Sequence, residues 1–263
     1  MTEERFLKLV GRSQEISPEH LEEVFHGKIE RLLTESNPKT LKGLKKGYLS
    51  AILHLSPSDR SGFQTCAKAT VGCRAACLNT AGRGGMGLKT HGDNGVQKAR
   101  RRKTHWFFAR RAEFMEQLVI EITRHVAKAE RKGFIPCIRL NGTSDLKWET
   151  IPVGGHANIF QMFPDVQFYD YTKVPNRDLG IPNYHLTFSV AESNEADAEA
   201  ELQRGMNLAV VFDRVPSEYL GVPVVDGDES DLRFLDAKGV VVGLKAKGEA
   251  LADTSGFVKR VAA

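Results

Sequence analysis

The chain has 263 residues, of which 41% are hydrophobic and 27% are charged, as is usual for a globular protein. Its net charge of +4 is too small to indicate by itself a nucleic-acid-binding protein. No run approaches the roughly 20 apolar residues that span a bilayer, and the charged N-terminus lacks the apolar stretch of a signal peptide. We therefore expect a cytoplasmic protein with no membrane partner. In that compartment clustered thiols more often bind metals than form disulfides.

The first 46 residues are predicted to form an N-terminal helical extension that a linker joins to the main domain. Ser17 followed by Pro18 is a typical helix start. Lysine and glycine residues in 37–47 indicate the linker, and we place one α/β domain over 47–263. The apolar residues that repeat at helical spacing in the extension are Leu21, Val24, Phe25, Ile29, Leu32 and Leu33.

Strand-like and helix-like segments alternate from residue 48 onward. An apolar run between turn signals predicts a strand at 48–55, and a cysteine loop follows at 66–77. Apolar residues at intervals of three, four or seven predict one long helix over 95–132, which ends at Gly133.

The rest of the chain continues this alternation. A helix is expected to end near Phe163, and another is expected to begin at the capping residue Ser193 and end at Gly205. Strands separated by helical crossovers predict an α/β fold, an open sheet or partial (β/α) barrel with mainly parallel strands. The further strands are expected at 134–141, 166–173, 184–190 and 207–213, with one or two more in 222–226 and 239–245.

Three of the four cysteines lie close together, with the spacing C-x6-C-x3-C at Cys66, Cys73 and Cys77. Thiolates are soft ligands that suit zinc and iron–sulfur centres. Structural zinc usually takes four ligands in paired short spacings, which are absent here, whereas three cysteines can hold a four-iron cluster whose fourth iron stays open. Iron–sulfur, zinc and unligated thiols remain as alternatives. Cys137 lies within an apolar strand and is expected to pack in the core.

Polar residues follow several of the predicted strands. In a parallel sheet these strand ends meet along one crevice, so the side chains are expected to converge on a binding site. Each also has a structural alternative, because Ser144 or Asp145 can cap a helix and Lys173 or Arg177 can lie in solvent. The group comprises Arg139, Asn141, Thr143, Ser144, Asp145, Tyr171, Thr172, Lys173, Asn176, Arg177, Ser189, Glu192, Ser193, Asn194, Asp213 and Arg214.

Basic residues concentrate in 98–111, a stretch without acids that lies in the predicted long helix. Such a run either forms a solvated helix face or binds the phosphates of a nucleic acid or a nucleotide. We expect Arg100, Arg101 and Arg102 to be substrate or phosphate contacts.

The segment from 43 to 258 resembles a family of bacteriophage and prophage proteins. More loosely, a strand followed by a three-cysteine loop and alternating α/β units resembles the radical S-adenosylmethionine (SAM) superfamily. Two features depart from that superfamily: its usual spacing is C-x3-C-x2-C, and Ala76 replaces the aromatic residue common before the last cysteine. The segments that carry the resemblance to the bacteriophage and prophage family include TCAKATVGCRAACLNTAGRGGM, IRLNGTSD, FYDYTKVPNR, LTFSVAESNEA and GLKAKG.

The resemblance implies a [4Fe-4S] cluster that binds SAM at its open iron. Cys66, Cys73 and Cys77 would be the cluster ligands. Residues after the second strand would lie where the superfamily holds the SAM amino group, and residues after the fourth strand would lie near the ribose or carboxylate. These cofactor-binding residues are Thr143, Ser144 and Asp145, followed by Ser189 and Asn194.

The leading hypothesis is therefore an iron–sulfur enzyme of radical SAM type. It would modify a nucleic acid, a nucleotide or a protein component during phage infection, in the host cytoplasm. Lys173, Arg177 and the basic helix would pair with substrate charges. The alternative is a non-catalytic nucleic-acid-binding module in which zinc or an iron–sulfur centre stabilises the cysteine loop. A third hypothesis is an enzyme scaffold reused for protein–protein interaction.

Overall fold

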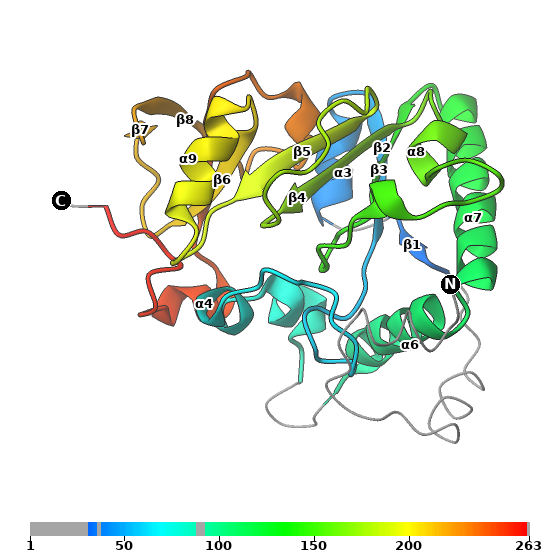
Figure 1. The fold of residues 1–263 in the computed structure, drawn as a ribbon, viewed down its shortest axis with the longest axis horizontal. Coiled ribbons are helices and arrows are strands. Elements are labelled where there is room, and N and C mark those ends of the chain that lie inside the picture. Colours follow the sequence, from blue (N-terminus) through cyan, green and yellow to red (C-terminus); the bar gives the residue numbers. More distant parts are fainter. Residues whose placement is uncertain (1–30, 36–37, 88–92, 262–263) are drawn as a thin grey trace.

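A computed structural model of the chain describes residues 31–35, 38–87 and 93–261 (Figure 1). The helix expected to start at Ser17 lies outside these residues. The expected linker begins outside them as well, but from Pro38 to Leu44 it forms a helix, α3. Leu32 and Leu33 do not extend a helical stripe, because Leu33 and Thr34 form a short strand, β1, and both leucines are buried.

The centre of the fold is a mainly parallel sheet, in which the described residues contribute nine strands. After β1 the strands are β2 (Tyr48–Leu53), β3 (Ile135–Arg139), β4 (Gln167–Thr172), β5 (Tyr184–Ser189), β6 (Asn207–Phe212), β7 (Glu218–Tyr219), β8 (Val222–Asp226) and β9 (Val241–Lys245).

The strands lie in the order β1-β2-β3-β4-β5-β6-β9-β8-β7. Only the two edge pairs, β1 with β2 and β7 with β8, are antiparallel. From β2 to β6 the spatial order follows the chain order, and most of the helices between these strands pack on the same face of the sheet. The expected mixed α/β fold with mainly parallel strands is confirmed.

Helices follow several of the parallel strands. The α-helices after α3 are α4 (Val71–Ala75), α6 (Gly95–Ala109), α7 (Arg111–Arg131), α8 (Ile159–Met162) and α9 (Glu195–Gln203). Single 3₁₀ turns are η1 (Leu78–Thr80), η2 (Gly82–Gly84), η3 (Trp148–Thr150), η4 (Arg233–Leu235) and η5 (Gly248–Ala252).

Successive side chains along each strand point to opposite faces of the sheet. Ala51, Ile138, Phe168 and Phe188 point to the first face. They form the main core with apolar side chains of α6, α7, α8 and α9, among them Phe107, Phe114, Leu118, Phe160 and Ala198. The second face carries a smaller apolar group of Cys137, Tyr169 and Leu232, together with several charged residues.

Two expected helices differ from the structure. The predicted helix 95–132 is two helices, because the chain breaks at Arg110, whose φ of −136° and ψ of 62° are not helical. The helix expected before Phe163 is reduced to η3 and the four-residue α8. The helix after β5 begins one residue later than predicted, with Asn194 rather than Ser193 at its N-cap.

Membrane insertion by a helix finds no support in the described part of the chain. None of its helices is long and apolar enough to cross a bilayer.

Candidate metal centre

The cysteine segment, which we define as residues 66–80, follows β2 in the chain and lies beyond the carboxyl ends of the parallel strands. Figure 1 shows α4 and α6 below the sheet, on the side toward which β4 and β5 point. Cys66 forms an isolated parallel bridge with Asp145, which follows β3. The Asp145 backbone N–H donates to the Thr65 carbonyl over 2.8 Å. The fold therefore brings Cys66 next to the segment that was expected to bind a cofactor.

Cys66 is half-buried between backbone groups. Its Sγ accepts the Ser58 backbone N–H at 3.3 Å and lies 3.9 Å from the Thr143 carbonyl oxygen. Burial, with smaller contributions from Asp145 and Cys77, raises the pKa of the Cys66 thiol to about 12. The metal-free thiol is therefore protonated at neutral pH, and a metal cation that binds it has to displace this proton.

Cys73 and Cys77 lie close together at the end of the same segment. Cys73 is in α4, which starts at the capping residue Thr70, and Cys77 precedes η1. Burial raises the pKa of Cys77 and the neighbouring Cys73 thiol adds to this rise, whereas Arg60 and Lys173 lower it. Because each thiol influences the next, the three sulfurs share one region, and cations lie beside it.

Glu192, in the loop after β5, holds α4 in place. Its carboxylate accepts the Gly72 N–H and the Thr70 hydroxyl, each over 2.7 Å. A Cβ atom at Gly72 would lie 2.9 Å from Phe257 Cβ and closer still to Ser255 Oγ, so only glycine fits there. Among the polar residues at the strand ends, nothing in the sequence distinguishes Glu192 as the one that holds α4.

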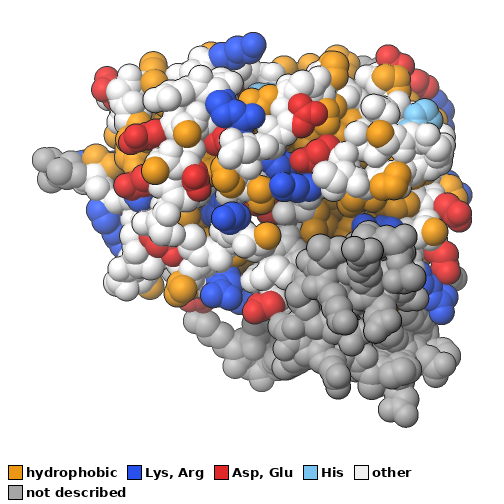
Figure 2. Space-filling model, viewed as in Figure 1, with side chains coloured by type: hydrophobic (Ala, Val, Ile, Leu, Met, Phe, Trp, Pro, Cys, Tyr) orange, Lys and Arg blue, Asp and Glu red, His pale blue; other side chains and the backbone are white. Residues whose placement is uncertain are grey.

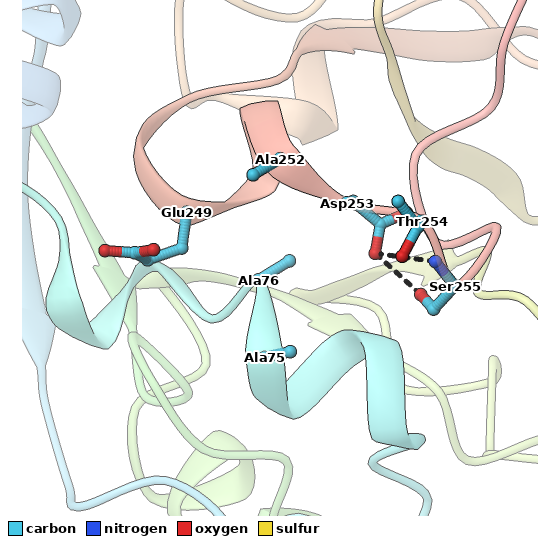
Figure 3. Close-up of a pocket in the computed structure, with 7 residues that line it drawn as sticks. All are labelled: Ala75, Ala76, Glu249, Ala252, Asp253, Thr254 and Ser255. Atoms are coloured by element: carbon cyan, nitrogen blue, oxygen red, sulfur yellow. Dashed lines mark hydrogen bonds between the residues drawn. The ribbon is translucent and has the colours of Figure 1, made fainter.

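A small pocket lies between α4 and η5, on the outer side of the cysteine segment. Its volume is about 270 Å³. Figure 3 shows that the Asp253 carboxylate accepts hydrogen bonds from Ser255 along one wall. No cysteine is among the residues that line the pocket. The lining residues are Ala75, Ala76, Glu249, Ala252, Asp253, Thr254 and Ser255.

The three expected SAM-amine residues lie beside Cys66, but their side chains already have partners. The Thr143 hydroxyl donates to the Leu55 carbonyl over 2.6 Å, and the Ser144 hydroxyl donates to Asn141 Oδ1 over 2.9 Å. Asp145 accepts the Lys173 N–H over 2.7 Å. These side chains fix the loop after β3.

The two expected residues after β5 have different contacts. Asn194 accepts the Ala191 N–H at 2.7 Å and donates to the Ser189 carbonyl at 3.1 Å, so its side chain closes the turn before α9. The Ser189 hydroxyl instead accepts Lys173 Nζ over 2.8 Å. Lys173 also lies close enough to Cys77 to lower its pKa. Lys173 and Ser189 therefore combine a cation and a hydroxyl beside the thiols.

Arg177 does not face solvent or a substrate. Its side chain is 0% exposed and forms a bidentate ion pair with Glu149, with N–O distances of 2.5 and 2.6 Å. It also lies 3.5 Å from Asp145 and donates to the Tyr184 hydroxyl over 3.1 Å. Arg177 therefore ties strand-end loops together, because all of its polar atoms already have protein partners.

Much of the basic run in 98–111 is paired within the protein. Arg100 donates to Asn79 on the cysteine segment, and Arg101 pairs with Asp93. Lys103 donates to the Leu32 carbonyl over 2.8 Å, and burial lowers its pKa to about 8. Arg102 is half-buried. Outside the grey residues, the face seen in Figure 2 shows Lys and Arg interspersed with acids rather than one basic patch.

The thiols do not form a site for a single ion in the described part of the chain. Among the described residues, no three His, Cys, Asp or Glu side chains are grouped so that they could hold one metal ion. A tetrahedral zinc needs its sulfurs about 2.3 Å from one common point. In a four-iron cluster each cysteine binds a different iron, so its sulfurs lie farther apart.

Comparisons with known proteins identify a family. A search of the curated proteins and of the solved structures finds no match to this chain. The family model described as Gene product 88 matches residues 31–261, which is most of the chain and includes every residue that the structure describes. The chain therefore belongs to the Gene product 88 family, a family of phage gene products.

Proposed function

We propose that this protein is an iron–sulfur enzyme of the radical SAM type, in which Cys66, Cys73 and Cys77 hold a [4Fe-4S] cluster. The observation that carries this proposal is the location of the thiols. They lie on the loop after the first parallel strand, at the carboxyl ends of a sheet whose strands follow chain order from β2 to β6. Binding sites of parallel α/β folds form at these strand ends.

Three cysteine ligands leave one iron of such a cluster free for a second ligand. When bound, the cluster and SAM would supply hydrogen-atom abstraction through one-electron cleavage of SAM. The protein's own part is to hold both groups and to place cations near the thiolates. Lys173 and Arg60 serve this last purpose, because both lower the pKa of Cys77.

The residues that support SAM binding differ in part from those expected. The Thr143 and Ser144 hydroxyls are used internally, but the Thr143 carbonyl lies 3.9 Å from Cys66 Sγ and can accept an amino group. Lys173 Nζ, held 2.8 Å from Ser189 Oγ, offers a cation to a carboxylate. An amino acid group bound beside the thiols would thus meet a carbonyl and an ammonium group.

The nucleic-acid partner expected from the basic run is not part of this proposal. Five of the seven basic residues in that run make contacts within the described part of the protein. Arg100 contacts the cysteine segment, Arg101 pairs with Asp93 and Lys103 donates to the Leu32 carbonyl. Arg110 pairs with Glu113, and Arg111 donates to the Phe107 carbonyl. A protein that binds nucleic acid mainly through phosphates needs several free cations on one surface.

The proposal is tested by purifying the protein without oxygen and measuring iron, sulfide and zinc per chain. We expect about four iron and four sulfide per chain, as in a [4Fe-4S] cluster. Cys66→Ser, Cys73→Ser and Cys77→Ser should each lose most of the iron. The matched control is Cys137→Ser, because Cys137 is buried away from the cluster and should keep full iron content. A metal-free wild type would refute the proposal, and zinc alone would favour a structural site.

SAM cleavage is tested separately on the iron-loaded protein. After chemical reduction with SAM present, 5′-deoxyadenosine should form. Lys173→Met should weaken SAM binding about tenfold because it removes the cation for the carboxylate. Lys68→Met, at an exposed lysine of the same segment, is the control and should bind SAM as the wild type does. A loaded cluster without 5′-deoxyadenosine would leave a cluster protein that is not a radical SAM enzyme.

A further inference from the structure

The second face of the sheet carries buried charged and polar groups that take no part in the proposed iron–sulfur site. Register places Tyr169 beside His185 and Tyr171 beside Thr187 on this face. Arg139, at the end of β3, stacks over the Tyr171 ring, with its guanidinium carbon 4.7 Å from the ring centre. The segment that carries η4 adds Arg233, which is 1% exposed. We call Arg139, Tyr171, His185, Thr187 and Arg233 the second-face cluster.

The members of this cluster lie near one another. Arg139 and Arg233 both influence the pKa of Tyr171, and Arg233 lowers the pKa of His185. Two acids accompany the arginines. Arg139 Nη1 lies 3.0 Å from Asp231, and Arg233 Nε lies 3.3 Å from Asp236.

Several polar atoms of the cluster have no hydrogen-bond partner in the described protein. They are Arg139 Nε, Arg233 Nη1, Thr187 Oγ1 and His185 Nε2. The Thr187 side chain is completely buried, and both arginines are at least nine-tenths buried. A buried donor without an acceptor costs about 1–3 kcal/mol, so native proteins rarely leave several together. Such a concentration of unused donors indicates a ligand that brings acceptors.

The chemistry of the donors selects the ligand class. Guanidinium groups match the oxygens of carboxylates and phosphates, which they bind through charge-assisted hydrogen bonds. Asp236 Oδ2 forms an ion pair with Arg233 Nε, but neither atom makes a hydrogen bond within the described protein. A bound anion would compete with this carboxylate for the guanidinium.

We propose that the second-face cluster binds a small oxyanion group, a phosphate or a carboxylate, between Arg139, Thr187 and Arg233. The group reaches the cluster from the side of Arg139, whose side chain is 10% exposed. No cysteine belongs to this oxyanion site, so the site does not depend on the proposed iron–sulfur cluster. It gives the protein a second recognition point, for an anionic small molecule or an anionic part of a larger substrate.

The test is the thermal unfolding of the full-length protein with inorganic phosphate or acetate, each compared with chloride at the same ionic strength. One of the two anions should raise the unfolding temperature in a saturable manner. A stronger response to phosphate identifies a phosphate ligand, and a stronger response to acetate identifies a carboxylate. If neither anion stabilises the protein more than chloride does, the donors bind only water and the proposal is refuted.

Two substitutions should move the affinity in opposite directions. Thr187→Val removes an unpartnered hydroxyl, so it should leave the ligand-free protein as stable as the wild type but weaken anion binding about tenfold. Asp236→Asn removes the competing charge and should strengthen binding. Thr123→Val, at a threonine on α7 that bonds only the Val119 carbonyl, is the control and should not change the response. Unchanged anion binding in Thr187→Val and Asp236→Asn would overturn the proposal even if the anion stabilises the protein.

Discussion

The four cysteines differ in what surrounds each sulfur atom. Cys137 is completely buried, and its sulfur lies 3.1 Å from Ser50 Oγ, which confirms its predicted place in the core. Burial raises the pKa of Cys137 to about 12 and Asp231 contributes to this rise, so the thiol stays protonated. Cys77, by contrast, has Arg60 and Lys173 near it. Cys77 therefore has surroundings that favour the thiolate more than those of the core cysteine do.

The sequence located the candidate site better than it assigned roles within it. It placed Asp145 and Lys173 at strand ends, and the structure brings both to the cysteine segment. It could not show that the Thr143 and Ser144 hydroxyls donate hydrogen bonds within the protein, because Leu55, the partner of Thr143, is remote in the chain. Whether a strand-end residue is free depends on such distant partners, and no local pattern encodes them.

His185 should make stability depend on pH. Burial, with smaller contributions from Arg233 and Lys238, lowers the pKa of His185 to about 4. In the unfolded chain a histidine titrates near pH 6.5, so between about pH 6.5 and 4 only the unfolded state takes up the proton. His185 therefore contributes full stability above pH 6.5, and this contribution falls as the pH drops toward 4.

The measurement is the free energy of unfolding by urea at several pH values. The wild type should lose at most about 1.4 kcal/mol per pH unit relative to His185→Gln across this window. Other acids titrate in both proteins, so the difference between the two curves isolates the imidazole. Parallel curves from pH 7 to 4 would contradict the prediction.

At the scale of elements, aromatic packing explains the division of the predicted helix 95–132. The rings of Phe107 and Phe114 lie 5.2 Å apart, and those of Trp106 and Phe114 lie 5.4 Å apart. In a straight helix, seven residues span about 10 Å along the axis, so these contacts require the break at Arg110. Periodicity could predict which residues face the core, but no glycine or proline marks the break itself.

Helix α4 should depend on the absence of a side chain at Gly72. Gly72→Ala would push a methyl group against Phe257 and Ser255, and would displace the segment that carries Cys73. We expect the free energy of unfolding to fall by about 1–3 kcal/mol, as for other overpacked sites. Iron content after anaerobic purification should fall as well, because the proposed ligands move.

Gly95→Ala is the matched control for this substitution. Gly95 begins α6, and a Cβ atom there would meet nothing within 4 Å. Alanine favours the helix, so stability and iron content should equal or exceed those of the wild type. If Gly72→Ala behaves in the same way as Gly95→Ala, the close packing of α4 on the C-terminal segment is not required.

At the scale of the whole molecule, the central strands and their mainly parallel direction followed from the sequence, whereas the edge strands β1 and β7 and the strand order at the far edge did not. β9 inserts between β6 and β8, so the last three strands leave chain order. A two-residue turn at Leu220 and Gly221, both with positive φ, joins β7 to β8. This pairing depends on contacts between distant strands, which alternation within each strand cannot reveal.

Arg177 connects the parts of the strand-end surface, and its geometry should be required for stability. It pairs with Glu149 and Asp145 from the loop after β3 and bonds Tyr184 on β5. Arg177→Lys keeps the charge but cannot form the bidentate pair, so it should lower the free energy of unfolding by about 3 kcal/mol. Arg74→Lys, at a pair with Asp59 whose side chains are 47% and 46% exposed, should cost less than about 1 kcal/mol. Equal losses in urea denaturation would mean that the buried pair contributes no more than a surface contact.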